Sequence, residues 1–126
     1  MNWAAFGIAA FVALAIIAIG LLYIWVPLVA TRSFGLPLPE SGANVPWWLR
    51  LKGVRDIASG LTVLTMMACG TPRMVGIILL AETVIPVGDM TLVLASKGSR
   101  GKAFGMHGIT ALAMFLAASA LILGVN

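Results

Sequence analysis

Four ionisable side chains lie inside segments of the chain that are otherwise apolar. Arg55 and Asp56 are neighbours in the stretch LKGVRDIASG, residues 51–60. Asp89 lies in the next apolar segment, and His107 lies in the last one. A cation, two carboxyl groups and an imidazole suffice for acid–base chemistry, since one carboxylate removes a proton while a second acid protonates a leaving oxygen. The candidate catalytic residues are therefore Arg55, Asp56, Asp89 and His107.

The composition places these residues in a membrane protein. Only 10% of the 126 residues are charged, 61% are hydrophobic and the mean hydropathy is +1.08, whereas a soluble domain has about 25% charged residues. Most of the eight Lys and Arg residues flank apolar spans, as topology signals do. This distribution argues against a nucleic-acid partner. We expect one transmembrane domain, residues 1–126, in the cell's inner (plasma) membrane.

Four spans fit the hydropathy pattern: residues 3–30, 48–69, 73–96 and 103–125. Each exceeds the roughly 20 residues that cross a bilayer. The first span is too long, and lacks the basic flank, for a signal peptide. The two loops on one side, with the helix ends beside them, carry six basic residues, against Arg73 on the other side. The positive-inside rule then predicts a four-transmembrane-helix, all-α bundle with both termini on the outer side.

Helical spacing places polar side chains of the second span on one stripe, at intervals of i, i+3, i+4, i+7 and i+10: Lys52, Arg55, Asp56, Ser59 and Thr62. Glu82 and Asp89 share a face of the third span in the same way. A charged residue within a span costs about 2.5–3.5 kcal/mol on insertion scales, so such residues usually face the bundle interior. The two stripes are therefore expected to face each other.

The depths of these groups coincide. At 1.5 Å per residue, Asp56 lies about 12 Å inside the cytoplasmic boundary, Asp89 and Tyr23 about 10 Å, and His107 about 6 Å. Glu82 is nearer the midplane. The coincidence predicts one polar pocket in the cytoplasmic half of the bundle. We expect its substrate-binding residues to be Tyr23, Trp25, Ser59 and Glu82.

Each of these residues also has a structural interpretation. Lys52 is expected to extend toward the headgroups, and Trp25 suits an interfacial aromatic belt. Asp89 is a possible counter-ion for Arg55. Pro86 predicts a kink in the third span, which frees a backbone carbonyl. Between the first two spans, residues 31–48 contain three prolines and end in two tryptophans. This pattern predicts an interfacial loop, with a lid over the pocket as the alternative.

The stretch KGVRDIASG, the later Pro86 and Asp89, and the pair His107–Gly108 resemble an uncharacterised family of small four-helix membrane proteins of bacteria and fungi. The resemblance covers the last three spans and rests on an RD-xxx-G motif followed by an aspartate and a histidine. It implies a four-helix bundle in which Arg55, Asp56, Asp89 and His107 are the marked positions. It implies no reaction.

Three functions remain open. An enzyme would open an epoxide or move a double bond in a lipophilic small molecule, without a cofactor or metal. A proton-coupled transporter would use Glu82 and Asp89 and would form a homodimer through small residues. A structural or accessory subunit would use the polar cluster only to fix helix register. The expected partners are membrane lipid and a lipophilic substrate and, for the transporter, a second copy of the chain.

Overall fold

The computed structural model describes residues 2–125, and all regular structure in this range is helical. The described part of the chain contains no strand, so the predicted all-α class is confirmed. In chain order the elements are α1 (Trp3–Trp25), α2 (Pro27–Phe34), α3 (Val45–Cys69), α4 (Pro72–Glu82), α5 (Val84–Ala95), α6 (Arg100–Lys102), the π-helix η1 (Ala103–Gly108) and α7 (Ile109–Leu123).

Three helical segments are long and apolar enough to cross a membrane: α1, the continuous run α4–α5 (Pro72–Ala95) and the run α6–α7 (Arg100–Leu123). The protein is therefore a membrane protein. Helix α3 has 25 residues, which is sufficient length for a fourth span. It differs in composition, because Arg50, Lys52, Arg55 and Asp56 all lie in its first half.

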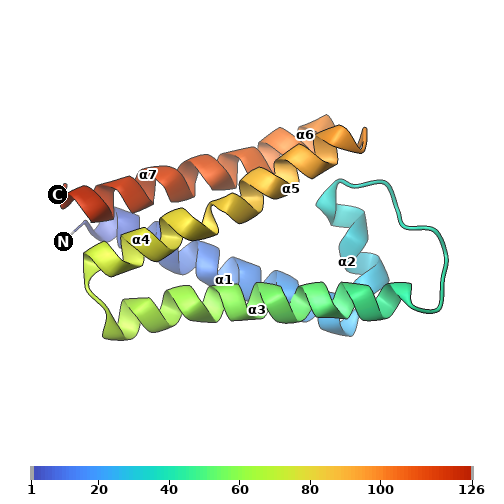
Figure 1. Cartoon of the computed structure of the whole chain (residues 1–126), viewed down its shortest axis with the longest axis horizontal. Coiled ribbons are helices and arrows are strands. Elements are labelled where there is room, and N and C mark those ends of the chain that lie inside the picture. Colours follow the sequence, from blue (N-terminus) through green and yellow to red (C-terminus); the bar gives the residue numbers. More distant parts are fainter. Residues whose placement is uncertain (1, 126) are drawn as a thin grey trace.

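The helices form two pairs, α1 with α3 and α4–α5 with α7 (Figure 1). The chain termini and the turn between α3 and α4 lie at one end of the bundle, and α2 lies at the other (Figure 1). At the end with the termini, α1 also packs on α7 and α3 on α4. The hydrophobic core is at this end and consists largely of small side chains, including Ala5, Ala9, Ala13, Ala117 and Ala118.

Glycines bring the backbones of α1 and α3 into direct contact. A Cβ added at Gly53 would lie 2.5 Å from the carbonyl oxygen of Gly20, and one added at Gly60 would lie 2.5 Å from the carbonyl oxygen of Ala13. These distances leave no room for a methyl group. Gly60 is the glycine of the RD-xxx-G stretch, so the last position of that motif serves helix packing.

The predicted first span, residues 3–30, is wrong at its end. Helix α1 stops at Trp25, and Val26 leaves the helical region with φ −132° and ψ 58°. The residue before a proline is disfavoured in helical conformation, whereas proline suits the first position of a new helix. Helix α2 therefore starts at Pro27 and turns across the end of the bundle (Figure 1). The last four residues of α2, residues 31–34, belonged to the predicted loop.

Two further breaks shape the second helix pair. Pro86 provides no N–H for the carbonyl of Glu82 four residues earlier, and the helix is interrupted at Thr83 between α4 and α5. The kink predicted from Pro86 is thus present. The six residues Ala103–Gly108 form a π-helix at the start of the last span, where a regular α-helix was expected.

Replacing Gly60 with alanine is expected to destabilise the fold by about 1–3 kcal/mol, the usual range for overpacking. The new methyl group would push against the backbone of α1, which cannot move as a side chain does. Thermal unfolding in detergent measures the effect. Gly7→Ala on α1 is the matched control, because a Cβ there has no neighbour within 4 Å. Equal unfolding temperatures for the two variants would contradict the close contact of α1 and α3.

Candidate functional site

A cavity of about 190 Å³ lies between the two helix pairs, and residues of both pairs and of α2 line it. It is slightly larger than an apolar cavity of about 150 Å³ that holds benzene. Phe11, Ile16 and Ile19 of α1 line its apolar wall. Its polar lining consists of Tyr23, Ser33, Lys52, Ser59, Glu82, Asp89, His107 and Thr110. The cavity therefore combines an apolar wall with several ionisable groups.

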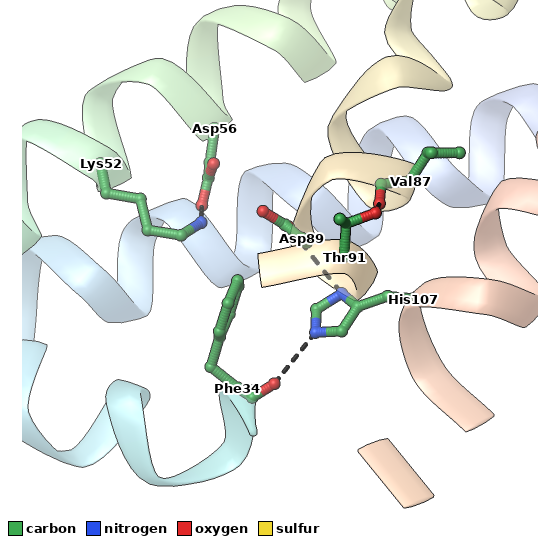
Figure 2. Close-up of polar contacts among 7 residues, drawn as sticks. All are labelled: Phe34, Lys52, Asp56, Val87, Asp89, Thr91 and His107. Carbon is green, nitrogen blue, oxygen red and sulfur yellow. Dashed lines mark hydrogen bonds and ion pairs between the residues drawn. The ribbon is translucent and has the colours of Figure 1, made fainter. Parts of the chain in front are cut away.

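Lys52 and Asp56 form an ion pair on α3, with 2.6 Å between Lys52 Nζ and Asp56 Oδ2 (Figure 2). Asp56 is only 6% exposed, and it lies behind Lys52 rather than in the cavity lining. The ammonium group also lies 4.8 Å from the centre of the Tyr23 ring and 5.1 Å from that of Phe34. Lys52 thus turns into the protein and does not extend to the headgroups as expected. The carboxylate and the two ring faces hold the cation at the cavity wall.

His107 and Asp89 also line the cavity, with 3.8 Å between His107 Nδ1 and Asp89 Oδ2 (Figure 2). His107 Nε2 lies 2.9 Å from the carbonyl oxygen of Phe34. Because a carbonyl only accepts, Nε2 must carry the hydrogen of this bond. Nδ1 then carries a second proton only in the imidazolium form. His107 Nδ1 and Asp89 Oδ2 therefore attract each other only when a proton lies on one of these two atoms.

Helix α2 covers the polar end of the cavity, and the last carbonyls of that helix are satisfied by the α5–η1 region. Phe34 O accepts from His107, Arg32 O accepts from Lys102 Nζ at 2.6 Å, and Gly35 O accepts from Ser99 N at 2.8 Å. Gly35 has the left-handed φ of 108° that ends the helix. Residues 31–34, which were predicted as part of the interfacial loop, therefore form the second half of a docked helix, and Phe34 contributes the acceptor for His107.

The π-helix η1 places His107 in the site. His107 is 8% exposed, although its neighbours Gly105 and Met106 are exposed. A π-helical turn contains an extra residue and often marks a functional position. The wider turn directs the imidazole toward α2 and α5 rather than toward lipid (Figure 2). The sequence gives no clear signal for it beyond three glycines between residues 101 and 108.

A second polar pair lies farther from α2. Ser59 Oγ donates a hydrogen bond to Glu82 Oε2, and both residues line the cavity. Glu82 lies seven residues before Asp89, which corresponds to roughly 10 Å along a helix. The pair thus connects α3 to the kink between α4 and α5, closer to the middle of the bundle, as the depth of Glu82 predicted.

Of the eight residues predicted for the site, five line the cavity: Tyr23, Ser59, Glu82, Asp89 and His107. Asp56 does not line it but pairs with Lys52, which does. Arg55 and Trp25 are exposed and do not line it. Arg55 lies outside the cavity because adjacent helical residues point about 100° apart. It therefore faces outward when Asp56 faces inward. For the same reason the five-residue stripe divides, and Thr62 is exposed.

Lys52 and Phe34 belong to the site although neither was predicted to. Lys52 could have been found from its spacing, since it precedes Asp56 by four residues and the two share a helix face. Phe34 gives no comparable signal, because its contribution depends on a backbone carbonyl.

Within residues 2–125, no three His, Cys, Asp or Glu side chains gather in a way that could hold a metal ion.

Residues 13–123 match the family model described as Domain of unknown function (DUF4267), and the chain belongs to this family. The expected membership in an uncharacterised family is confirmed. The RD-xxx-G motif, the occurrence in bacteria and fungi, and the helix count stay predictions. No curated protein and no solved structure matches the chain.

Replacing Lys52 with methionine is expected to lower the free energy of unfolding by about 1.5–3 kcal/mol, because it leaves the buried Asp56 carboxylate without its charged partner. Arg55→Met is the matched control on the same helix. It removes an exposed cation, so its effect should stay within about 0.5 kcal/mol. Denaturation of both purified variants provides the comparison.

The double variant Lys52→Met with Asp56→Leu should recover most of the loss, since it removes both charges together. If Arg55→Met costs as much as Lys52→Met, the assignment of Lys52 as the partner of Asp56 is wrong.

Proposed function

We propose that this member of the DUF4267 family is a four-span integral membrane enzyme that performs acid–base chemistry on a lipophilic small molecule. One observation carries the proposal. A single cavity contains the His107–Asp89 pair on one wall and the Lys52 ammonium group on another, next to an apolar wall. The proposed reaction is the opening and hydrolysis of an epoxide or the migration of a double bond, and neither reaction requires a cofactor.

The proposed topology has α3 as the fourth span and both termini on the outer side. Helix α3 packs against α1 (Figure 1), and its ionisable Lys52 and Asp56 neutralise each other inside the protein, which lowers the cost of insertion. The basic residues near the α2 end are Arg32, Arg50, Lys97, Arg100 and Lys102. By the positive-inside rule this end faces the cytoplasm of the inner membrane.

The sequence contains a natural reporter of this topology. Cys69 is the single cysteine, it is exposed, and it lies at the end of α3 on the side of the termini. A membrane-impermeant maleimide should label it in intact cells without permeabilisation. In a Cys69→Ser background, Ser99→Cys at the other end should be labelled only after permeabilisation. The reverse pattern would contradict the proposed orientation, and labelling of both cysteines in intact cells would contradict a crossing by α4–α5, which separates them. The fourth span itself is tested with Ser41→Cys in the loop before α3, because labelling of that residue on the same side as Cys69 would contradict it.

The proposed roles follow from which groups line the cavity. Asp89 is the general base, because among the described residues its carboxylate accepts no hydrogen bond and faces His107 Nδ1. His107, held by Phe34 O, is the acid that returns the proton. Lys52 takes the part first assigned to Arg55 and stabilises negative charge on a substrate oxygen. Asp56 and Tyr23 are positioning residues for Lys52.

Two balanced reactions fit these roles. In epoxide hydrolysis, Asp89 takes a proton from water, the water oxygen bonds to a ring carbon, and the released oxygen takes a proton from His107. In double-bond migration next to a carbonyl, Asp89 takes a proton from carbon and Lys52 stabilises the enolate oxygen. The proton then returns to a different carbon. After epoxide hydrolysis, the proton that Asp89 took from water passes to His107 Nδ1, 3.8 Å away. After double-bond migration, Asp89 has already returned its proton to the substrate. Both routes therefore restore the starting protonation state of the site.

The lining of the cavity supports a lipophilic substrate. Phe11, Ile19, Ile85 and Met106 line it and are also exposed on the protein surface, with 74% exposure at Phe11. On a bundle that spans the bilayer, this rim faces the lipid chains. A substrate dissolved in the bilayer would reach the polar groups from the side, without passing through water.

The proton-coupled carrier remains the alternative, and the position of Glu82 favours it. Glu82 and Asp89 line the same cavity from one kinked run of helix, so a proton could move between them. A carrier of this size would act as a homodimer, for which the exposed Gly101 and Gly105 provide a smooth surface. A structural or accessory subunit is the third possibility.

The enzyme proposal is tested with protein reconstituted in liposomes and a panel of lipophilic epoxides and β,γ-unsaturated ketones. We expect turnover of one class, with isotope from labelled water in the diol oxygen or in the carbon–hydrogen bond of the product. Asp89→Asn and His107→Gln should lower kcat by about 100-fold or more, the usual contribution of a general base or acid.

Glu40→Gln is the matched control, since it also turns a carboxyl into an amide but lies in the exposed loop before α3. It should leave turnover unchanged. Turnover that survives both Asp89→Asn and His107→Gln would contradict the assigned roles. If no substrate is converted and Glu82→Gln instead abolishes proton uptake into sealed liposomes, the carrier replaces the enzyme.

A further inference from the structure

A second hollow lies outside the cavity described above, on the surface at the α2 end of the bundle. It is a groove of about 450 Å³ between the chain after α2 and the turn that joins α5 to α6. Three cationic residues line it, Arg32, Lys97 and Lys102, together with Ser99 and the apolar residues Leu36 and Leu38. No carboxylate is among its lining residues. We call this hollow the basic groove.

We propose that the basic groove binds the phosphate group of an anionic membrane lipid. Its position supports a lipid rather than a soluble anion, because it lies directly beyond the last residue of the α5 span and before the first residue of α6. Leu36 and Leu38 are 40% and 62% exposed beside the cations. This arrangement suits a phosphate on the cations with an acyl chain against the leucines.

The backbone at Lys97 provides a second, independent observation. Lys97 has φ 56°, and it is the one non-glycine residue with positive φ in the described chain. It follows the end of α5, where Gly98 N donates to Val93 O at 2.8 Å and Lys97 N donates to Leu94 O at 3.1 Å. This is the position at which helices usually place glycine. A lysine in this left-handed conformation sacrifices local stability and places a cation on the groove.

The two sides of the basic groove belong to the parts that hold α2 on the bundle. Arg32 comes from α2, whereas Lys97 follows α5. Directly beside them, Lys102 donates to Arg32 O and Ser99 to Gly35 O. A phosphate shared by Arg32 and Lys97 would add a third bridge between these segments. Lipid binding should therefore raise the stability of the folded protein, since a ligand that binds only the native state stabilises it. The site does not depend on the proposed enzymatic function.

The test compares thermal unfolding of the protein in nanodiscs of phosphatidylcholine with unfolding in nanodiscs that also contain phosphatidylglycerol. The wild-type Tm should rise by several degrees with the anionic lipid. Lys97→Gly should abolish most of this rise and should itself fold well, because glycine adopts positive φ without strain. In phosphatidylcholine alone its Tm should equal or exceed that of the wild type. Arg32→Gln should also reduce the rise.

Arg100→Gln is the matched control. Arg100 lies in the same turn and carries the same charge, but it does not line the groove. It should keep the full rise in Tm. If Arg100→Gln loses as much of the rise as Lys97→Gly, the effect is general surface charge and the proposed site is wrong. A separate arm adds inorganic phosphate to phosphatidylcholine nanodiscs. An equal rise in that arm would overturn the lipid assignment in favour of a soluble anion.

Discussion

Polar side chains inside a membrane-spanning bundle must find their partners within the protein, because hydrocarbon offers no hydrogen bonds. The structure meets this constraint with contacts between different elements: Ser59 with Glu82, and His107 with the carbonyl of Phe34. Lys52 and Asp56 pair within α3. Among the described residues, no fully buried side-chain nitrogen or oxygen lacks a partner. Asp89 differs, since its carboxylate has only the 3.8 Å approach of His107. The Asp89 carboxylate, which accepts no hydrogen bond from the described residues, therefore faces the cavity.

The packing of small residues determines where this polar site lies. Alanines bring the helices together at the end with the termini, where they form the core, and Gly76 lies against the backbone of Ala118 there. The pairs α1–α3 and α4–α5–α7 diverge toward the other end (Figure 1). Helix α2, the kink at Thr83 and the π-helix all lie in or beside the diverging part. Each interrupts regular α-helix, and each contributes a residue or a backbone carbonyl near the cavity.

The sequence predicts the all-helical membrane class and most of the polar cavity, because hydropathy and helical periodicity record which faces are apolar. Depth along the spans was enough to associate Tyr23, Asp89 and His107. It could not distinguish Arg55 from Lys52 as the inward cation, since this depends on the rotation of α3 about its axis, which Gly53 and Gly60 fix against α1. The break at Val26 could be predicted from Pro27, but the docking of α2 on the bundle could not be predicted. That docking depends on backbone carbonyls and on a π-helix, neither of which has a side-chain pattern.

The central claim is that His107 and Asp89 hold one proton between them while Phe34 O fixes the other ring nitrogen. Because His107 is the single histidine, nitrogen NMR of protein labelled at histidine and reconstituted in lipid reports on this pair alone. The account predicts one fixed form with a proton on Nε2, and an Nδ1 signal that shifts when Asp89 is replaced by asparagine. Two nitrogen signals averaged by rapid tautomer exchange, unchanged by Asp89→Asn, would contradict it.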